Sequence, residues 1–384
     1  VDYLITSGTD PRTILSISLD NARNSQYRTS EKLYAYFAEK IKEIGKHCII
    51  LIDEVQLCEH FEFAINGLKE DFEADIYVTG SNSEFLSKDI STVFRGRSTE
   101  IKVFPLSFEE FMNHVPGDYE TLFKEYIMYG GMPNLLELAS SAERDNYLSN
   151  LMDTVLLRDI VDRHHLRNVN LFYALVDFLL SNIGSYVSAN NIANYFRSNG
   201  YKNVDSDTIG SYLEYLCDAF LFYKVQRYDI KGKEYLKTLN KYYVCDLGLR
   251  NVRMNYRQME QTHMLENLIY LDLLRRGYVV DIGKNNDKEI DFVVRKAERL
   301  WYIQVAYTLS GEGKLEQEIK PFEKIDDGFI KEAINTGKSK EMSNHKLLVT
   351  KNKGNIPAAA SAAPLIDEEG RVFSEIRCLS PSLL

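Results

Sequence analysis

Cysteine is scarce in this chain of 384 residues, with five in all and no C-x-x-C pair among them. An odd number without such pairs excludes a disulfide framework and a zinc ribbon, so we expect buried thiols. No apolar run approaches the roughly 18 residues that a membrane-spanning helix needs, and the N-terminus has no basic stretch followed by an apolar segment. We therefore expect a cytoplasmic protein with no membrane contact.

An excess of basic residues is also missing, because 46 Lys and Arg stand against 56 Asp and Glu, a formal net charge of -10. That charge disfavours wholesale binding to nucleic acid or to an anionic membrane, so any such contact needs a local basic patch. What is present is ordinary globular composition, with 45% hydrophobic residues, 25 Tyr and 19 Phe. The aromatic content excludes disorder over most of the length, and the length predicts two or three domains.

The first third alternates between strand and helix patterns. Residues 13–18 are β-prone, residues 30–44 carry apolar side chains at helical spacing, and residues 48–52 form a continuous apolar run. Residues 75–78 and 100–104 repeat the strand pattern. Alternating β and α elements with buried strands predict a parallel α/β sheet.

Polar side chains follow two of these predicted strands. Asp53 and Glu54 come directly after residues 48–52, and Ser81 and Asn82 follow residues 75–78. Ligands of parallel sheets bind at the carboxyl ends of the strands. In a nucleotide-hydrolysing site Asp53 would hold Mg²⁺ through water, and Glu54 would orient and deprotonate the attacking water. The alternative is an ordinary acidic loop beside a Gly-Ser turn.

The middle of the chain reads as helical, with a β-hairpin after three amphipathic stretches. The helices are predicted at 171–183, 188–198 and 206–218, and the strands at 220–228 and 235–244. Three helices and a hairpin are typical of a winged helix. Its recognition helix would carry Asp205, Asp207 and Glu214 and no Lys or Arg. We therefore expect a packing or partner surface, with an unknown protein as the partner, rather than a sequence reader.

The hairpin itself is basic. Its turn and second strand contain Lys231, Lys233 and Lys237, and further basic residues are Lys224, Arg227 and Lys241. Such a wing could touch a nucleic-acid backbone weakly without reading sequence. A solvated surface hairpin is the alternative that we favour.

Four strings in this order and spacing resemble the AAA-type P-loop ATPases of bacteria and archaea that carry an uncharacterised C-terminal domain: CIILIDEVQ, VTGSNSEFLS, FRGRSTEI with VFPLSFEEF, and YGGMPNLLEL. The resemblance covers nearly the whole chain and implies ATP and Mg²⁺ as ligands. It implies that Asp53 and Glu54 are the Walker B pair and that Asn82, with Ser81, is the sensor. Arg95 or Arg97 would be the arginine finger.

One departure from that family is large. No G-x-x-x-x-G-K-[ST] motif occurs in the 384 residues, so the backbone cradle for the phosphates and its Lys are missing from the printed sequence. In relatives the loop directly precedes the strand that residues 13–18 match. We therefore expect the loop to lie upstream of Val1, and the chain as printed to bind nucleotide poorly.

The last third resembles the restriction-nuclease fold through Glu266, Asp291 and Gln304. Active members need a second carboxylate where Gln304 stands and a Lys where Ala306 stands, because two carboxylates hold the metal and the Lys activates the nucleophile. We therefore expect an inactive, vestigial nuclease site, unless a Lys such as Lys320 has taken over that role.

The sequence thus predicts three domains: an α/β parallel-sheet P-loop ATPase core at 1–117, a helical winged-helix domain at 118–250, and an α/β restriction-nuclease-like domain at 251–384. The leading interpretation is an ATPase that couples nucleotide state to the placement of its C-terminal domains. Two alternatives stay open: a non-catalytic interaction protein with a relic ATPase core, and an ATP-dependent DNA-processing nuclease. An oligomer is possible, because an arginine finger acting between subunits requires a neighbour.

Overall fold

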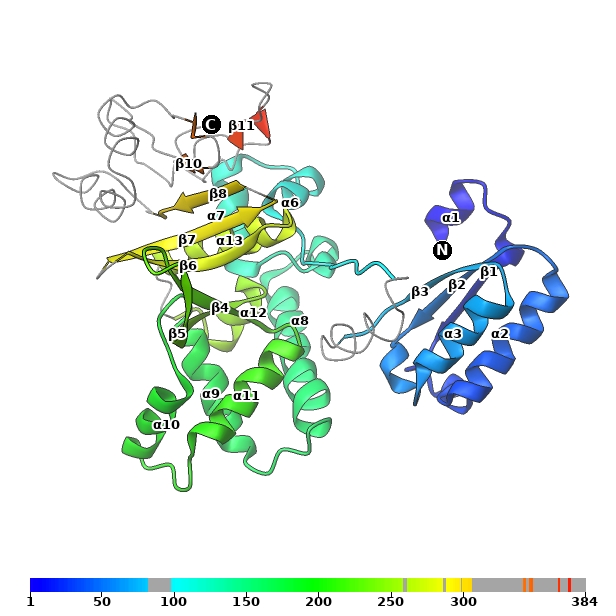
Figure 1. The fold of residues 1–384 in the computed structure, drawn as a ribbon, viewed down its shortest axis with the longest axis horizontal. Coiled ribbons are helices and arrows are strands. Elements are labelled where there is room, and N and C mark those ends of the chain that lie inside the picture. Colours follow the sequence, from blue (N-terminus) through cyan, green and yellow to red (C-terminus); the bar gives the residue numbers. More distant parts are fainter. Residues whose placement is uncertain are drawn as a thin grey trace. The chain divides into compact units, whose positions relative to one another are not determined.

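The computed structural model describes residues 1–81, 98–257, 261–285, 288–297 and 299–305, together with four short strands between 341 and 373. The chain forms two compact units (Figure 1). The first consists of Val1–Val103 with Asp218–Phe220, and the second of Phe104–Cys217 and the residues from Leu221 onward. Each unit has its own sheet.

The first unit is built on a three-stranded parallel sheet in the order β1-β2-β3. Its strands are β1 Ile14–Ser18, β2 Cys48–Asp53 and β3 Ala74–Val78. Its helices are α1 Asp2–Thr6, α2 Ser30–Ile44 and α3 Phe61–Asp71, with short 3-10 turns at Pro11–Thr13, Ala22–Tyr27 and Val55–Leu57. The alternating β and α elements confirm the predicted parallel α/β arrangement, and α2 has the same bounds as the helix expected at 30–44.

One face of this sheet is covered by α2 and α3, which pack against each other (Figure 1). Leu33, Phe37 and Ile41 recur at helical spacing on α2 and are buried against Ile50 and Ile52 of β2. Gly45 ends α2 in the left-handed conformation, with φ of 64°, which glycine adopts at little cost. The helical spacing and the apolar strand together account for this core.

The strand expected at residues 100–104 is wrong. These residues have no strand structure, and the side chains of Ile101 and Val103 are exposed. A β-prone segment forms a strand when it can pair with a neighbouring strand and bury one face; this segment has no strand pairing in the described residues and leaves Ile101 and Val103 exposed. Just after this segment a capping box starts α6, in which Ser107 and Glu110 satisfy each other's backbone N–H.

The second unit begins with helices. They are α6 Phe108–His114, α7 Tyr119–Tyr129, α8 Ser141–Thr154, α9 Val169–Ser181, α10 Ala189–Ser198, α11 Ser206–Asp218, α12 Leu247–Arg253 and α13 Gln261–Arg275. A 3-10 turn at Pro133–Glu137 precedes α8, and a π-helix at Val155–Asp162 follows it. The three predicted middle helices correspond to α9, α10 and α11.

The described residues of this unit also form a seven-stranded mixed sheet, in the order β5-β4-β6-β7-β8-β10-β9. Its strands are β4 Phe222–Asp229, β5 Glu234–Val244, β6 Val279–Asn285, β7 Lys288–Lys296, β8 Arg299–Ile303, β9 Glu341–Met342 and β10 His345–Leu347. A separate pair is formed by β11 Leu365–Ile366 and β12 Val372–Phe373. Helix α13 packs against β5 and β6 (Figure 1).

The separate winged-helix domain is not confirmed. The hairpin β4-β5 is present, but β4 pairs in parallel with β6, so the hairpin continues the C-terminal sheet instead of standing free as a wing. The predicted boundary at residue 250 therefore separates strands of one sheet. Sequence pattern alone missed this, because the pairing of β4 with β6 joins residues about fifty positions apart.

A buried carboxylate fastens the Gly130-Gly131 turn to α12. Asp246 is the N-cap of α12, and its carboxylate accepts hydrogen bonds from the backbone N–H of Gly131 at 2.7 Å and of Gly248 at 2.8 Å. Burial raises the pKa of Asp246, while these N–H donors act in the opposite direction. The glycines leave room for this approach, since a Cβ on Gly130 would lie 2.0 Å from the carboxylate.

None of the helices in the described residues is long and apolar enough to cross a membrane. Of the cysteines described, Cys48, Cys58 and Cys245 are buried free thiols, as the sequence predicts, and Cys217 is partly exposed.

Replacing Gly248 by alanine tests the close contact between α12 and the chain around the Gly130-Gly131 turn. The new Cβ would lie 1.8 Å from the carbonyl oxygen of Tyr129, which is backbone and cannot swing away. We expect Gly248→Ala to destabilise the protein by about 3 kcal/mol, measured from urea unfolding followed by circular dichroism.

Gly210 in α11 is the matched control, because a Cβ added there would meet nothing within 4 Å. Gly210→Ala should leave stability unchanged or raise it by about 0.5–1 kcal/mol, the usual difference between Gly and Ala inside a helix. Equal urea midpoints for the Gly248→Ala and Gly210→Ala proteins would contradict this description of the contact at Gly248.

Candidate functional site

Three polar side chains meet at the carboxyl edge of the first unit's sheet. Asp53 ends β2, and the strand register places Ser18 of β1 directly beside it. The Asp53 carboxylate accepts hydrogen bonds from the hydroxyl of Thr79 at 2.6 Å and from that of Ser18 at 3.1 Å. Asp53 is itself exposed, so both oxygens are oriented by neighbours while the group still faces solvent.

Glu54 lies next to this trio in a special backbone conformation. Its φ is 53°, in the left-handed region that non-glycine residues seldom adopt. Its carboxylate accepts hydrogen bonds from the Gln56 amide and from the Ser81 hydroxyl, the latter at 3.2 Å. The Gln56 amide also donates to Ser81 at 3.2 Å. The strained backbone and the two donors together fix where Glu54 points.

The structure thus brings together three of the residues predicted from sequence: Asp53, Glu54 and Ser81. It adds Thr79, Gln56 and Ser18, which were given no role. The register of a parallel sheet could have indicated Ser18 and Thr79, since both stand where a strand ends. The predicted sensor Asn82 and the arginine-finger candidates Arg95 and Arg97 lie outside the described residues.

This edge suits Mg²⁺ and a water nucleophile. Mg²⁺ usually keeps several waters and uses one or two carboxylates together with substrate phosphates, which matches a single exposed, oriented Asp53. The Glu54 carboxylate has other partners than the Asp53 carboxylate, and the two residues are linked through Thr79, whose hydroxyl accepts from the Glu54 backbone N–H at 3.3 Å and donates to Asp53. One carboxylate can therefore serve the metal and the other the water.

A second acidic cluster lies in the second unit. Carboxylate oxygens of Glu266 on α13 and of Glu289 and Asp291 on β7 lie within 4.8 Å of one another. Glu266 and Asp291 were predicted to be neighbours, whereas Glu289 was not identified. Gln304, the third predicted residue, accepts a hydrogen bond from the backbone N–H of Asp291 at 3.4 Å. Ala306 and Lys320 lie outside the described residues.

Lys241 enters this cluster from β5. Its ammonium lies 2.8 Å from an oxygen of Glu266 and 2.5 Å from an oxygen of Glu289, and the residue is 4% exposed. From sequence we placed Lys241 with the basic residues of a surface hairpin, and this is wrong. The C-terminal end of β5 is buried in the core, since Tyr242, Tyr243 and Val244 are all buried. Lys241 directly precedes them and is buried with them.

Burial and charge both act on the ionisable groups here. Burial raises the pKa of Asp291 well above its ordinary value, and the neighbouring Glu266 raises it further. Burial lowers the pKa of Lys241, but the carboxylates of Glu266 and Glu289 outweigh it and hold that pKa above its ordinary value. Lys241 therefore stays protonated, and Asp291 resists ionisation.

The other predicted lysines differ from Lys241. Lys231 and Lys233 are exposed at the β4-β5 turn, where Asp229 accepts hydrogen bonds from the backbone N–H of Lys231 at 3.1 Å and of Gly232 at 2.8 Å. Lys237 lies in β5, and its side chain is outside the described part of the structure. The exposed turn is compatible with a weak contact to a nucleic-acid backbone.

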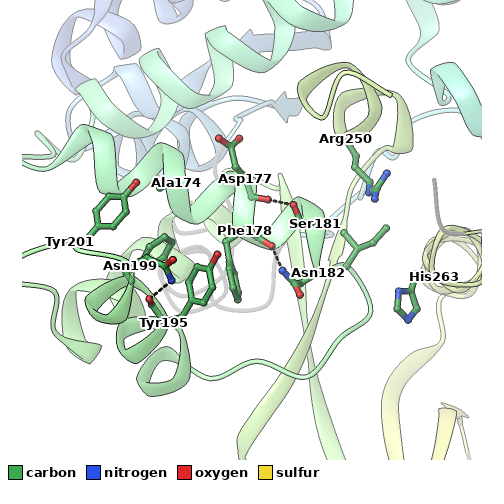
Figure 2. A pocket seen from close by; sticks show the side chains of 12 residues that line it. Ala174, Asp177, Phe178, Ser181, Asn182, Tyr195, Asn199, Tyr201, Arg250 and His263 are labelled. Atoms are coloured by element: carbon green, nitrogen blue, oxygen red, sulfur yellow. Dashed lines mark hydrogen bonds between the residues drawn. The ribbon is translucent and has the colours of Figure 1, made fainter. Parts of the chain in front are cut away.

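An open pocket of about 1090 Å³ lies among α9, α10, α12 and α13 (Figure 2). Its aromatic wall contains Phe178, Tyr195, Phe196 and Tyr201, whose rings pack in sequence with centroids 4.9 to 6.0 Å apart. Figure 2 shows Arg250 and His263 on the other side. The rings contact one another, so these side chains pack α9 against α10 as well as lining the pocket.

The raised pKa of Asp291 predicts a pH dependence of stability. A carboxyl whose pKa is higher in the folded state stabilises the fold fully below the unfolded pKa, and this stabilisation is lost as pH rises through the folded value. Asp291→Asn keeps an acceptor for the Val305 N–H, which now bonds Asp291 at 2.6 Å, but cannot ionise. We expect the variant to lose less stability than the parent as pH rises from about 4 towards neutral, measured by urea unfolding.

Comparisons with known proteins agree with the first unit's geometry. Residues 1–112 match the AAA domain family, and residues 120–260 match a domain of unknown function, DUF8612. An uncharacterized protein of Haemophilus influenzae is 36% identical over 313 residues, which cover 80% of this chain and 78% of the relative.

Two further similarities are weaker. The uncharacterized protein MJ1544 of Methanocaldococcus jannaschii is 31% identical over 291 residues, 72% of this chain but 64% of its own length. The Aeropyrum pernix ORC1 protein, solved in complex with DNA, aligns with 66% of this chain and 79% of its own at 11% identity and a TM-score of 0.30, too low to show a shared fold. On the strength of the Haemophilus influenzae relative and the AAA match, the chain belongs to that relative's family, with an AAA domain of the P-loop ATPase class at residues 1–112.

Proposed function

We propose that the protein binds and hydrolyses ATP in its first unit, and that nucleotide state is coupled to the placement of the C-terminal unit. The observation that carries this proposal is the cluster at the sheet edge, where Asp53 and Glu54 are each held by separate hydroxyl or amide donors. Membership of the AAA domain family supports it. The second unit is proposed to be nuclease-like and inactive.

The two carboxylates have different tasks in this proposal. Asp53 would hold Mg²⁺ through water, and a bound ion would supply positive charge beside the phosphates. Glu54 orients the attacking water and takes its proton as the bond to phosphorus forms and ADP leaves. Ser81 and Gln56 hold Glu54 in place, and Asn82 with Arg95 or Arg97 would complete the site as sensor and arginine finger.

No G-x-x-x-x-G-K-[ST] motif occurs among the printed residues, so the proposal needs a phosphate cradle that these residues do not supply. Activity is therefore tested in the full-length protein. A full-length protein that neither binds nor hydrolyses ATP would favour the alternative of a non-catalytic interaction protein.

Glu54→Gln tests the general base. The amide can still accept hydrogen bonds but cannot take a proton, so we expect kcat for ATP hydrolysis to fall by about 10²–10⁴-fold while ATP binding is retained. Phosphate release gives the rate, and fluorescence of a labelled ATP analogue gives the binding.

Glu59→Gln is the matched control, because Glu59 is an exposed acid five residues further along the same loop. It should hydrolyse ATP at the parent rate. A Glu54→Gln variant as fast as this control would show that Glu54 is not the base.

Thr79→Val tests the orientation of Asp53. The change keeps the shape but removes the hydroxyl that bonds Asp53 at 2.6 Å, so the Ser18 hydroxyl is left to orient Asp53 without it. We expect the Mg²⁺ concentration for half-maximal ATPase activity to rise several-fold, whereas Thr79→Ser, which keeps a hydroxyl, should stay near the parent. An unchanged Mg²⁺ requirement in Thr79→Val would contradict the proposal that Thr79 orients Asp53 for Mg²⁺ binding.

A further inference from the structure

We propose that the ammonium group of Lys241 is the resident cation of the acidic cluster of Glu266, Glu289 and Asp291, and that it keeps divalent metal ions out of the second unit. The inference deepens the proposed inactive, nuclease-like character of this unit and rests on that part of the proposed function. It concerns an internal replacement: a side chain of the same chain takes the place where a metal would be bound.

The position of the ammonium carries the argument. Lys241 lies 2.8 Å from Glu266 and 2.5 Å from Glu289, so it contacts carboxylates from α13 and β7 at once. All three acids offer oxygens within 4.8 Å of one another, a spacing that could surround one ion. The ammonium therefore contacts two of the three groups that would otherwise form the metal's ligand set.

The surrounding side chains complete the coordination of Lys241. Its ammonium also lies 5.3 Å from the centre of the Tyr186 ring, a cation-π distance. Tyr243 donates a hydrogen bond to the same oxygen of Glu266 that Lys241 contacts. The cluster is thus satisfied by donors of the chain itself, as buried carboxylates require.

A metal ion and this ammonium exclude each other. Mg²⁺ binds carboxylate oxygens directly at about 2.0–2.1 Å and demands near-octahedral geometry. It would compete with Lys241 for the oxygens of Glu266 and Glu289, and two cations this close repel strongly in a low-dielectric interior. The raised pKa of Lys241 agrees with an ammonium that stays charged at neutral pH.

The third carboxylate of the cluster is held by the backbone. The Val305 N–H donates a hydrogen bond to Oδ2 of Asp291 at 2.6 Å. Each of the three acids therefore has a donor within the chain: Lys241 for Glu266 and Glu289, and the Val305 N–H for Asp291.

A catalytic lysine would be placed differently. In a working nuclease the Lys positions or activates the water that a neighbouring metal binds. Here the ammonium bonds directly to two would-be metal ligands, which leaves no separate place for the metal. The structure therefore favours replacement of the metal over a migrated catalytic lysine.

The test measures Mn²⁺ binding to the full-length protein in an Asp53→Asn background, so that the proposed ATPase metal does not contribute. Bound Mn²⁺ is read from the loss of the free-ion signal in electron paramagnetic resonance. We expect the Asp53→Asn protein to bind no Mn²⁺ in the second unit, and the added change Lys241→Met to create one site per chain. The created site should disappear when Asp291→Asn is added.

Lys224→Met is the matched control, because Lys224 is an exposed lysine on the neighbouring strand β4. It should create no Mn²⁺ site. A thermal melt provides a second readout: Mn²⁺ should raise the Tm of the Lys241→Met protein by several degrees, on the order of 5 °C, and leave that of the Lys224→Met protein unchanged.

Two results would overturn the proposal. One is an Mn²⁺ site in the Asp53→Asn protein that disappears when Asp291→Asn is added, because a metal would then bind beside Lys241. Metal-dependent DNA cleavage by the Asp53→Asn protein would likewise show that a metal binds there. The other is a folded Lys241→Met protein that binds no Mn²⁺. If Lys241→Met does not fold, the first measurement still decides. None of these readouts depends on ATP hydrolysis, so a failed ATPase proposal is distinguishable from a failed replacement.

Discussion

Buried carboxylates need hydrogen-bond donors or cations as partners, and in the second unit such contacts join segments that are distant in the sequence. Asp246 is buried and accepts backbone N–H groups from the Gly130-Gly131 turn and from α12. Glu266 is buried and accepts from Lys241 and Tyr243 of β5. Each carboxylate ties segments more than twenty residues apart, so losing one partner would leave a buried charge uncompensated. The helices and the mixed sheet are joined through such contacts as well as through apolar packing.

The first unit uses its carboxylates in the opposite way. Asp53 ends a buried strand but remains exposed, and its partners among the described residues are the hydroxyls of Ser18 and Thr79. An oriented carboxylate that still faces solvent retains the capacity to bind an added ion, whereas the Glu266 cluster already contains an ammonium. The two clusters contain similar groups, but they differ in burial and in the presence of the Lys241 ammonium beside Glu266.

Much of the fold could be predicted from local pattern. The apolar run ending at Asp53 and the helical spacing of Leu33, Phe37 and Ile41 predict the strand and helix that are found. Residues 100–104 show where local pattern fails, since they resemble a strand but have no strand structure, and the side chains of Ile101 and Val103 stay exposed. The hairpin after α11 was also predicted, yet not its pairing with β6, because a parallel contact between distant strands leaves no mark in either sequence.

The sequence by itself determined the polar residues at the strand ends, since Asp53 and Glu54 must follow a buried strand wherever the sheet lies. Only the tertiary structure decided the surroundings of Lys241. A lysine in a basic hairpin reads as a surface charge, and it becomes a buried counter-ion because β5 joins the sheet beside α13 and β7. Charge is a property of a residue, but its partner depends on which distant strands meet.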